Sequence, residues 1–152
     1  MSLNLIFAPL AETGKNIEQA AALLKAGKLV AIPTETVYGL AANALNEQAV
    51  LKIFEAKNRP FFDPLIIHVH SIEAATQYAV FNDQRLLQLA RRFWPGPLTL
   101  LLPKKEMIPA IVTSGLDQVA VRVPDHVLSL SLLKALDLPL AAPSANPFGY
   151  VS

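Results

Sequence analysis

The chain has 152 residues, of which 53% are hydrophobic and 16% are charged, so it can build the core of one domain and does not belong to the disordered class. Its formal net charge of +1 predicts no global polyanion-binding field, and the absence of cysteine excludes disulfides, thiolate metal sites and cysteine nucleophiles. No apolar stretch approaches the roughly 20 residues of a membrane span, and residues 1–10 lack a secretory signal pattern. We therefore expect a soluble cytoplasmic protein that makes no use of a membrane.

Helical and strand patterns alternate along the chain. Helices are predicted where apolar residues recur at helical spacing behind a capping side chain, and strands where short apolar runs end at proline or a polar residue. The expected helices cover residues 16–27, 46–56, 71–78, 83–93 and 125–136, and the expected strands cover 29–32, 65–69, 98–102, 119–123 and 140–142. This order predicts one α/β domain over 1–152, with a mixed or mainly parallel sheet flanked by helices. Asn16, Asn46 and Asp125 are the predicted caps of three of these helices.

Hydroxyl and carboxylate side chains follow the first predicted strand. Thr34, Glu35 and Thr36 lie in the segment 33–39, where they can donate to and accept from a small polar ligand. The alternative is turn chemistry, in which the threonines only cap a loop.

Two polar pairs share an i, i+2 spacing. Lys57 and Arg59 lie just past the end of the second predicted helix, so both cations can reach one polyphosphate. The alternative is a solvated pair that complements the helix C-terminus. Ser144 and Asn146 follow the last predicted strand, and taken alone they form only a strand-to-turn connection. Neither common glycine-rich nucleotide cradle is present, and no serine lies in a nucleophile-elbow context.

Histidine and arginine interrupt two of the apolar strands. His68 lies within the strand 65–69 and His70 at its exit, so packing, ligand binding, proton transfer and a metal pair are all open interpretations. No further metal-ligand spacing occurs nearby, and a metal site is not predicted. Arg122 lies in a hydrophobic strand, where burial of a guanidinium is costly unless an anion meets it. That anion is either a structural Asp or Glu or a ligand carboxylate.

Five short motifs occur along the chain in a specific order. They are Pro33-Thr34-Glu35-Thr36-Val37-Tyr38-Gly39-Leu40, Lys57-Asn58-Arg59-Pro60 with Pro64-Leu65 and His68, Pro95-Gly96-Pro97-Leu98-Thr99, Val121-Arg122-Val123-Pro124 and Ala142-Pro143-Ser144-Ala145-Asn146. Together they resemble the L-threonylcarbamoyladenylate synthase family with its YrdC-like domain, and the match covers about residues 16–152. The resemblance implies a nucleotidyltransferase in which threonine and bicarbonate give an N-carboxylated amino acid that attacks the α-phosphate of ATP and releases pyrophosphate.

The resemblance also implies site residues by position. The implied threonine-binding set, in which Arg122 pairs the amino-acid carboxylate, is Thr36, His68, Arg122 and the backbone around Ala142. The implied ATP-binding and catalytic set is Lys57, Arg59, Ser144 and Asn146, with further nucleotide contacts at Asp63, Gln118 and Ser152. Nucleotidyl transfer to a carboxylate needs positioning and charge neutralisation more than a strong base, so two cations and a Mg²⁺ ion held with ATP are sufficient in kind.

Three features depart from the family pattern. Asp63 stands where asparagine is often found and would repel phosphates unless a metal or cation intervenes, and Phe148 stands where a small serine is common. The family's domain also continues beyond Ser152, so we expect the C-terminal part of the domain to be missing from this chain.

The implied partners and the alternative functions complete the expectation. The implied substrates are ATP, L-threonine and bicarbonate, and the product passes to tRNA-modification partner proteins that build threonylcarbamoyladenosine in tRNA. The alternative is an RNA-binding maturation module for tRNA, rRNA or double-stranded RNA without its own catalysis, because YrdC-like domains present a basic concave face. A third reading is a carbamoyl-transfer relative that acts on another carboxylate acceptor, as related domains occur in hydrogenase maturation proteins.

Overall fold

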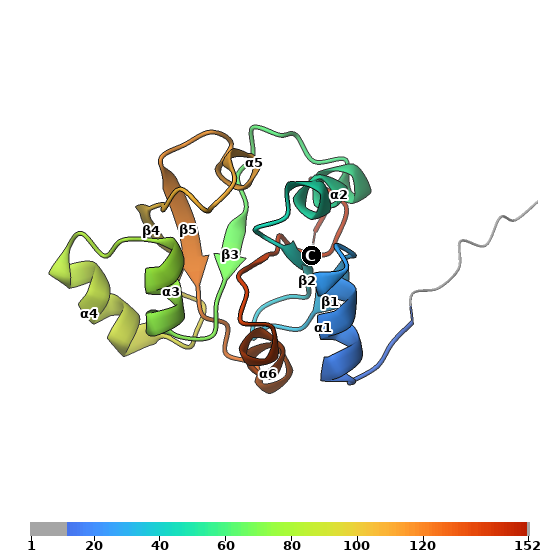
Figure 1. The fold of residues 1–152 in the computed structure, drawn as a ribbon, viewed down its shortest axis with the longest axis horizontal. Coiled ribbons are helices and arrows are strands. Elements are labelled where there is room, and N and C mark those ends of the chain that lie inside the picture. Colours follow the sequence, from blue (N-terminus) through green and yellow to red (C-terminus); the bar gives the residue numbers. More distant parts are fainter. Residues whose placement is uncertain (1–11, 152) are drawn as a thin grey trace, which may run out of the picture.

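In a computed structural model, residues 12–151 are described, and they form a six-stranded sheet flanked by six helices (Figure 1). The strands are β1 Val30–Ile32, β2 Gly39–Asn43, β3 Ile66–His68, β4 Leu100–Pro103, β5 Gln118–Arg122 and β6 Leu140–Ala141. The helices are α1 Ile17–Lys25, α2 Glu47–Lys57, α3 Ile72–Tyr78, α4 Gln84–Phe93, α5 Ala110–Thr113 and α6 Val127–Leu136. The expected single α/β domain is confirmed.

The sheet is mixed, as expected, but it is mainly antiparallel. The strand order is β1-β2-β6-β3-β5-β4, and among these neighbours only β3 and β5 run parallel. Of the two alternatives given by the sequence analysis, the mixed sheet is confirmed and the mainly parallel sheet is not. Two antiparallel pairings involve β6, which returns between β2 and β3, and the other two join β1 with β2 and β4 with β5. An alternating order of helices and strands does not by itself determine strand direction.

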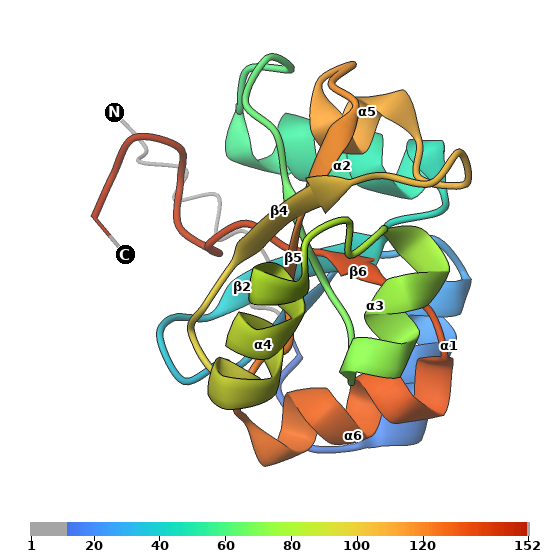
Figure 2. The ribbon, with the colours of Figure 1, turned by 90° about the vertical axis from the view of Figure 1, so that its left-hand side faces the viewer.

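Helices cover the two faces of the sheet unequally. One face packs on α2, α3, α4 and α5, in a core that includes the fully buried Phe54, Ile67 and Val121. The other face is covered by α1 and α6, which lie side by side (Figures 1 and 2). The apolar cluster under these two helices reaches only β1, β2 and β6 and includes Leu24 and Leu133. On this second face, the part formed by β3, β5 and β4 is therefore left without an apolar helix cover.

Helix caps follow the sequence signals in two cases and differ in a third. The Asn16 and Asn46 side chains each accept the backbone N–H three residues ahead, as predicted. The predicted Asp125 cap is wrong, because His126 is the N-cap of α6 and accepts a backbone N–H through Nδ1. The Asp125 amide instead donates to the Glu35 carboxylate, which holds Asp125 one residue before the cap.

Two elements were not predicted from the sequence. β2 has the sequence Gly-Leu-Ala-Ala-Asn, without the β-branched and aromatic residues that favour strands. α5 is a single turn with no side-chain cap. No helix within residues 12–151 is long and apolar enough to cross a membrane.

Candidate functional site

The site lies on the open part of the second sheet face. In the parallel pairing of β3 and β5, His68 and Arg122 are register partners, so their side chains share one face. Leu101 of β4, whose neighbours in the strand point into the core, is 57% exposed on this face. Gln118 also belongs to this face, at the opposite end of β5 from Arg122. His68 and Arg122 are thus buried polar residues on a sheet face that no helix of residues 12–151 covers, while Leu101 of the neighbouring strand is exposed there.

Arg122 is buried and makes contacts to its own chain through two of its three guanidinium nitrogens. The residue is 9% exposed, and its Nε donates to the Gly96 carbonyl oxygen at 3.3 Å. One terminal nitrogen donates to Thr36 Oγ1 at 3.2 Å and forms an ion pair with the Glu35 carboxylate. Burial lowers the pKa of the Arg122 guanidinium from its ordinary value. A structural carboxylate therefore meets this arginine, which was one of the two anions considered for it.

The loop between β1 and β2 combines turn chemistry with site chemistry. Thr34 Oγ1 accepts the backbone N–H groups of Thr36 and Val37, both at 3.2 Å, and donates to the Val37 carbonyl at 2.7 Å. This turn leaves the Thr36 hydroxyl against Arg122. Thr34 therefore serves to cap the turn, as the alternative interpretation predicts. Thr36 instead contacts Arg122.

His68 is a buried neutral histidine. It is 3% exposed, and burial lowers its pKa to about 4, although the backbone carbonyls of Leu140 and Ile66 oppose this shift. The imidazole is therefore neutral at pH 7. Among residues 12–151, Nδ1 of His68 finds no hydrogen-bond partner, which is uncommon for a buried polar atom.

Lys57 fastens the segment 143–146 to α2. It is the last residue of this helix rather than a residue just past its end, and it is 4% exposed. Its ammonium donates to the backbone carbonyl of Ser144 at 2.6 Å and to that of Asn146. Burial, and then the charge of Arg59, lower the pKa of Lys57. Lys57 thus brings the two i, i+2 pairs together, because its ammonium bonds to the backbone carbonyls of both Ser144 and Asn146.

Arg59 is held by a carboxylate, two carbonyls and a ring. Its terminal nitrogen lies 2.9 Å from Asp63 Oδ2 and donates to the Pro64 carbonyl at 3.0 Å, and its Nε donates to the Asp63 carbonyl at 3.2 Å. The Phe148 ring centroid lies 5.6 Å from the guanidinium carbon, which is cation–π distance. Arg59 is therefore the cation that offsets the charge of Asp63.

Backbone hydrogen bonds join two clusters of the site, one around Arg122 with Thr36 and His68 and the other around Lys57 and Arg59. The amide of Leu40 donates to the carbonyl of Pro143, and the amide of Ala145 donates to the carbonyl of Tyr38, both at 2.8 Å. The loop that carries Thr36 and the segment 143–146 therefore run side by side. Gly39 permits this approach, because a Cβ there would lie 3.2 Å from the Ala142 Cβ. Ala142 itself is buried, and its amide donates to the Ile66 carbonyl at 3.1 Å.

Some expected site residues lie apart, and others were missed. Gln118 is at the far end of β5 from Arg122, and Ser152 lies outside the described residues. Glu35 pairs with Arg122, and Phe148 contacts Arg59. Glu35 was expected only as a possible contact for a small polar ligand and Phe148 only as a departure from the family pattern, so neither contact with an arginine was predicted. The signal for Glu35 was present, because a carboxylate at the end of a buried strand is a natural partner for a strand arginine.

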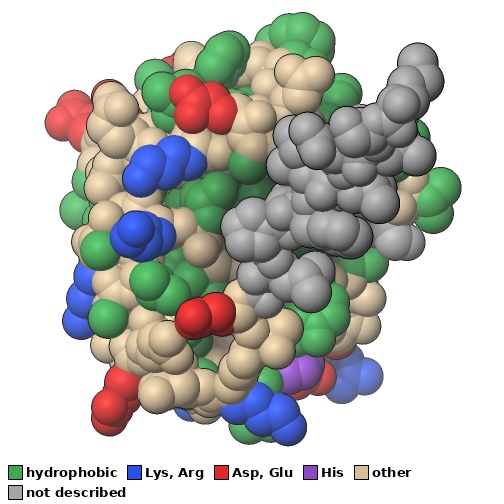
Figure 3. All heavy atoms as spheres, turned by 90° about the vertical axis from the view of Figure 1, so that its right-hand side faces the viewer, with side chains coloured by type: hydrophobic (Ala, Val, Ile, Leu, Met, Phe, Trp, Pro, Cys, Tyr) green, Lys and Arg blue, Asp and Glu red, His purple; other side chains and the backbone are tan. Residues whose placement is uncertain are grey.

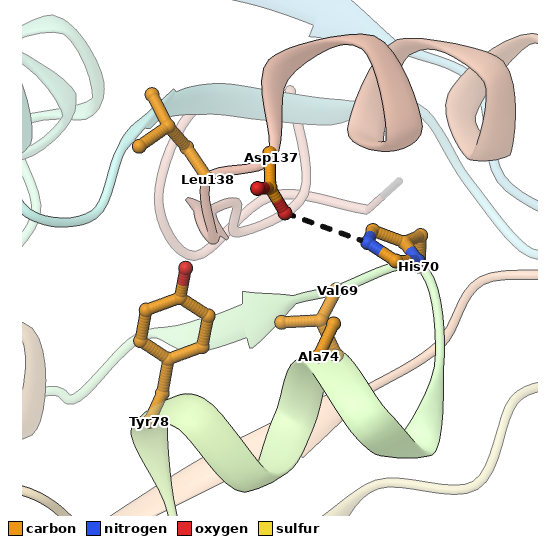
Figure 4. Close-up of a pocket in the computed structure, with 6 residues that line it drawn as sticks. All are labelled: Val69, His70, Ala74, Tyr78, Asp137 and Leu138. Atoms are coloured by element: carbon orange, nitrogen blue, oxygen red, sulfur yellow. Dashed lines mark ion pairs between the residues drawn. The ribbon is translucent and has the colours of Figure 1, made fainter.

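A separate group of polar side chains, His70, Tyr78 and Asp137, lies outside the site. His70 Nε2 lies 3.8 Å from Asp137 Oδ1, and the Tyr78 hydroxyl points toward the turn at Asp137 and Leu138 (Figure 4). Burial, and then the Asp137 charge, raise the pKa of Tyr78. Within residues 12–151, no group of three or more His, Asp or Glu side chains is arranged to hold a metal ion. The His68–His70 metal pair considered from the sequence therefore has no ligand set in the described part of the chain.

Known proteins share both the sequence and this fold. The profile of the Sua5/YciO/YrdC family, described as telomere recombination, matches residues 22–152. A threonylcarbamoyl-AMP synthase from Pyrococcus abyssi is 56% identical over 133 residues, which cover 88% of this chain and 39% of that protein. A threonylcarbamoyl-AMP synthase from Bacillus subtilis is 52% identical over 134 residues, again covering 88% of this chain and 39% of that protein.

A solved structure agrees with these sequence matches. The structure of Pyrococcus abyssi Sua5 complexed with L-threonine matches with a TM-score of 0.83 and 56% identity, covering 86% of this chain and 38% of that one. The chain thus spans about two fifths of the length of the relatives described here. The extent of the profile match and the identity of the relatives together show that the chain belongs to the Sua5/YciO/YrdC family.

Proposed function

We propose that this chain is the synthase domain of an L-threonylcarbamoyladenylate synthase. It would form threonylcarbamoyl-AMP and pyrophosphate from L-threonine, bicarbonate and ATP. The product would serve threonylcarbamoyladenosine synthesis in tRNA through partner proteins of the cytoplasm. The observation that carries this proposal is the joining of two cation clusters, one at Arg122 and one at Lys57 and Arg59, by the backbone bonds between the 33–39 loop and segment 143–146.

The threonine end of the site would be the cluster on β3 and β5. Arg122 offers a guanidinium to a carboxylate, and Thr36 offers a hydroxyl beside it. His68 is neutral and has a buried nitrogen without a protein partner in residues 12–151, so a polar group of the ligand would satisfy it. These three residues supply hydrogen bonds and one positive charge, which suit a small polar carboxylate ligand.

The nucleotide end would be the cluster at the end of α2. Arg59 presents a fork of donors held by Asp63 and Phe148, and such a fork suits phosphate oxygens. Lys57 uses its ammonium to hold the carbonyls of Ser144 and Asn146, so its main part in this proposal is to position that segment. Ser144 and Asn146 would then supply a hydroxyl and an amide to the phosphates from the segment that Lys57 holds.

Magnesium would enter with the nucleotide rather than occupy a protein cage. The nearby carboxylates Asp63 and Glu35 are already paired with arginines, and the described residues include no three-ligand group. The donor set therefore does not fit a resident Mg²⁺ site, and the ion is proposed only as part of the ATP substrate, held by its phosphates and water.

The chemistry asked of these residues is positioning. Joining bicarbonate to the threonine ammonium would form the N–C bond and release one water and one proton. The new carboxylate is already ionised, so no residue has to remove a proton from the attacking oxygen. The chain would hold that oxygen in line with the α-phosphate, and Arg59 would stabilise the charge that develops as pyrophosphate leaves.

A turnover assay and a binding assay test the proposal. The chain is incubated with L-threonine, bicarbonate, Mg²⁺ and labelled ATP, and we expect pyrophosphate release that depends on threonine. By calorimetry, Arg122→Met should weaken threonine binding at least tenfold, whereas Arg92→Met, on the exposed side of α4, should leave it unchanged. Absence of both threonine binding and threonine-dependent pyrophosphate release would refute the proposal.

The RNA-binding alternative has less support. On the face shown in Figure 3, Lys and Arg side chains are interspersed with Asp and Glu and form no continuous basic stripe among the described atoms. The two cations of the nucleotide cluster are also largely buried and tied to their own chain. Salt-dependent RNA affinity that survives Lys57→Ala with Arg59→Ala, together with absent ATP binding, would favour the alternative.

A further inference from the structure

The proposed threonine end of the site contains a carboxylate as well as a guanidinium. The Glu35 side chain is 19% exposed and the Arg122 side chain 11%, and they form an ion pair beside the Thr36 hydroxyl. The second oxygen of Glu35 accepts the amide of Asp125, so the carboxylate is fixed from both sides. Glu35 is the one carboxylate that contacts Arg122 within residues 12–151.

This pairing determines the net charge that a ligand meets. Arg122 is positive, Glu35 is negative and His68 is neutral at pH 7, so the cluster as a whole is close to neutral. A ligand with a carboxylate and no amine would add an uncompensated negative charge next to Glu35. A zwitterion would add none, because its ammonium can meet Glu35 while its carboxylate meets Arg122. Partial burial strengthens this difference, because the charges are poorly screened by water.

We infer that the Glu35–Arg122 pair selects an amino-acid zwitterion, with Arg122 contacting the ligand carboxylate and Glu35 its ammonium. Glu35 is then a specificity-determining residue of the threonine site. The inference rests on the proposed function, since it names the part of the substrate that Glu35 recognises. It also argues against one form of the third reading, in which the acceptor is a carboxylic acid without an amine, because Glu35 would disfavour such an acid.

Three ligands test the inference on the unmodified chain. L-threonine carries both charges, 3-hydroxybutyrate lacks the ammonium, and threoninol lacks the carboxylate. In calorimetric titrations at pH 7 we expect threonine to bind at least tenfold more tightly than either ligand with a single charge. Equal affinity for threonine and 3-hydroxybutyrate would overturn the inference without any variant being needed.

Substitution of Glu35 assigns the effect to its charge. Glu35→Gln should weaken threonine binding at least tenfold and leave 3-hydroxybutyrate binding unchanged or tighter, while Glu35→Asp should retain most of the preference. Glu55→Gln, on an exposed position of α2, is the matched control and should leave the ratio of the two affinities unchanged.

The outcomes separate this inference from the proposed function. Equal weakening of both ligands in Glu35→Gln would mean that Glu35 only holds Arg122 in place, and it would overturn the inference alone. Binding of neither ligand by the unmodified chain would overturn the inference, and together with absent threonine-dependent pyrophosphate release it would overturn the proposed function as well. Thermal unfolding followed by circular dichroism shows whether Glu35→Gln folds, and the three-ligand comparison on the unmodified chain decides the matter if it does not.

Discussion

Lys57→Met tests whether this lysine fastens the segment that carries Ser144 and Asn146. Methionine keeps an unbranched apolar side chain in the buried position but removes the ammonium, and with it both bonds to backbone carbonyls of this segment. The amide of Phe148, which donates to the Lys57 carbonyl at 3.3 Å, keeps its acceptor in the variant. The segment should therefore loosen at its centre while the helix stays intact.

The size of the effect follows from two opposing contributions. A hydrogen bond to a charged group contributes about 1.5–3 kcal/mol, and Lys57 makes two of them. Removal of the ammonium also removes the cost of burying it, and the two freed carbonyls lie in a half-buried segment where water can reach them. We therefore expect a net loss of about 1–3 kcal/mol, below the sum of the two bonds.

Hydrogen exchange locates this loss. In Lys57→Met the amide of Ala145, which bonds the Tyr38 carbonyl, should exchange about tenfold faster, because about 1.4 kcal/mol of local stability corresponds to a factor of ten. Lys52→Met is the matched control, since Lys52 lies on the same helix and donates to the Gly27 carbonyl at 2.8 Å instead. Unchanged exchange at Ala145 in the Lys57 variant would refute the fastening role.

Two further predictions concern the protonation of His68 at low pH and a steric overlap introduced at Gly96. The pKa of His68 is lowered to about 4 in the folded chain and lies near 6.5 in the unfolded chain, so the unfolded chain binds more protons between these values and stability falls as the pH drops through this window. The loss amounts to about 3 kcal/mol at most, and urea unfolding at pH 7 and pH 4 should show a smaller difference in His68→Asn. Gly96→Ala places a Cβ in overlap with the Phe93 carbonyl oxygen and shifts the carbonyl that accepts from Arg122, so the free energy of unfolding should fall by about 1–3 kcal/mol and threonine affinity should fall too. Gly14→Ala, where a Cβ meets no atom within 4 Å, should change neither quantity.

Local signals in the sequence were sufficient for most elements of the fold. Asn16 and Asn46 cap the helices predicted behind them, because a cap bond spans only three residues and its residue types are distinctive. The sheet's pairing was not accessible in this way. The residues of β2 are small and permit close packing, but they have low strand propensity, so β2 was not predicted. The antiparallel pairing of β6 depends on contacts with β2 and β3, which lie far away along the chain.

In the site, too, local features could be predicted from the sequence, whereas contacts between distant segments could not. Burial of Arg122 in a hydrophobic strand required an anion, and this could be stated from the sequence alone. Which anion it would be depended on a loop 86 residues away from Arg122, where Thr36 and Glu35 arrive only after the sheet has formed. Lys57 shows the limit more clearly, since nothing in a Lys-x-Arg pair indicates that the lysine would turn to the carbonyls of Ser144 and Asn146.

The charges of the two clusters differ in a way that suits two different ligands. At the proposed threonine end Arg122 is balanced by Glu35, so the cluster has no net charge to attract a simple anion. At the proposed nucleotide end the one carboxylate paired with Lys57 or Arg59 within residues 12–151 is Asp63, so one positive charge is left over in a largely buried setting. A polyanion gains from that excess and a zwitterion does not. Because the clusters are joined by backbone bonds rather than by a shared side chain, their charges can be altered separately, and loss of Glu35 should change amino-acid recognition while nucleotide affinity is retained.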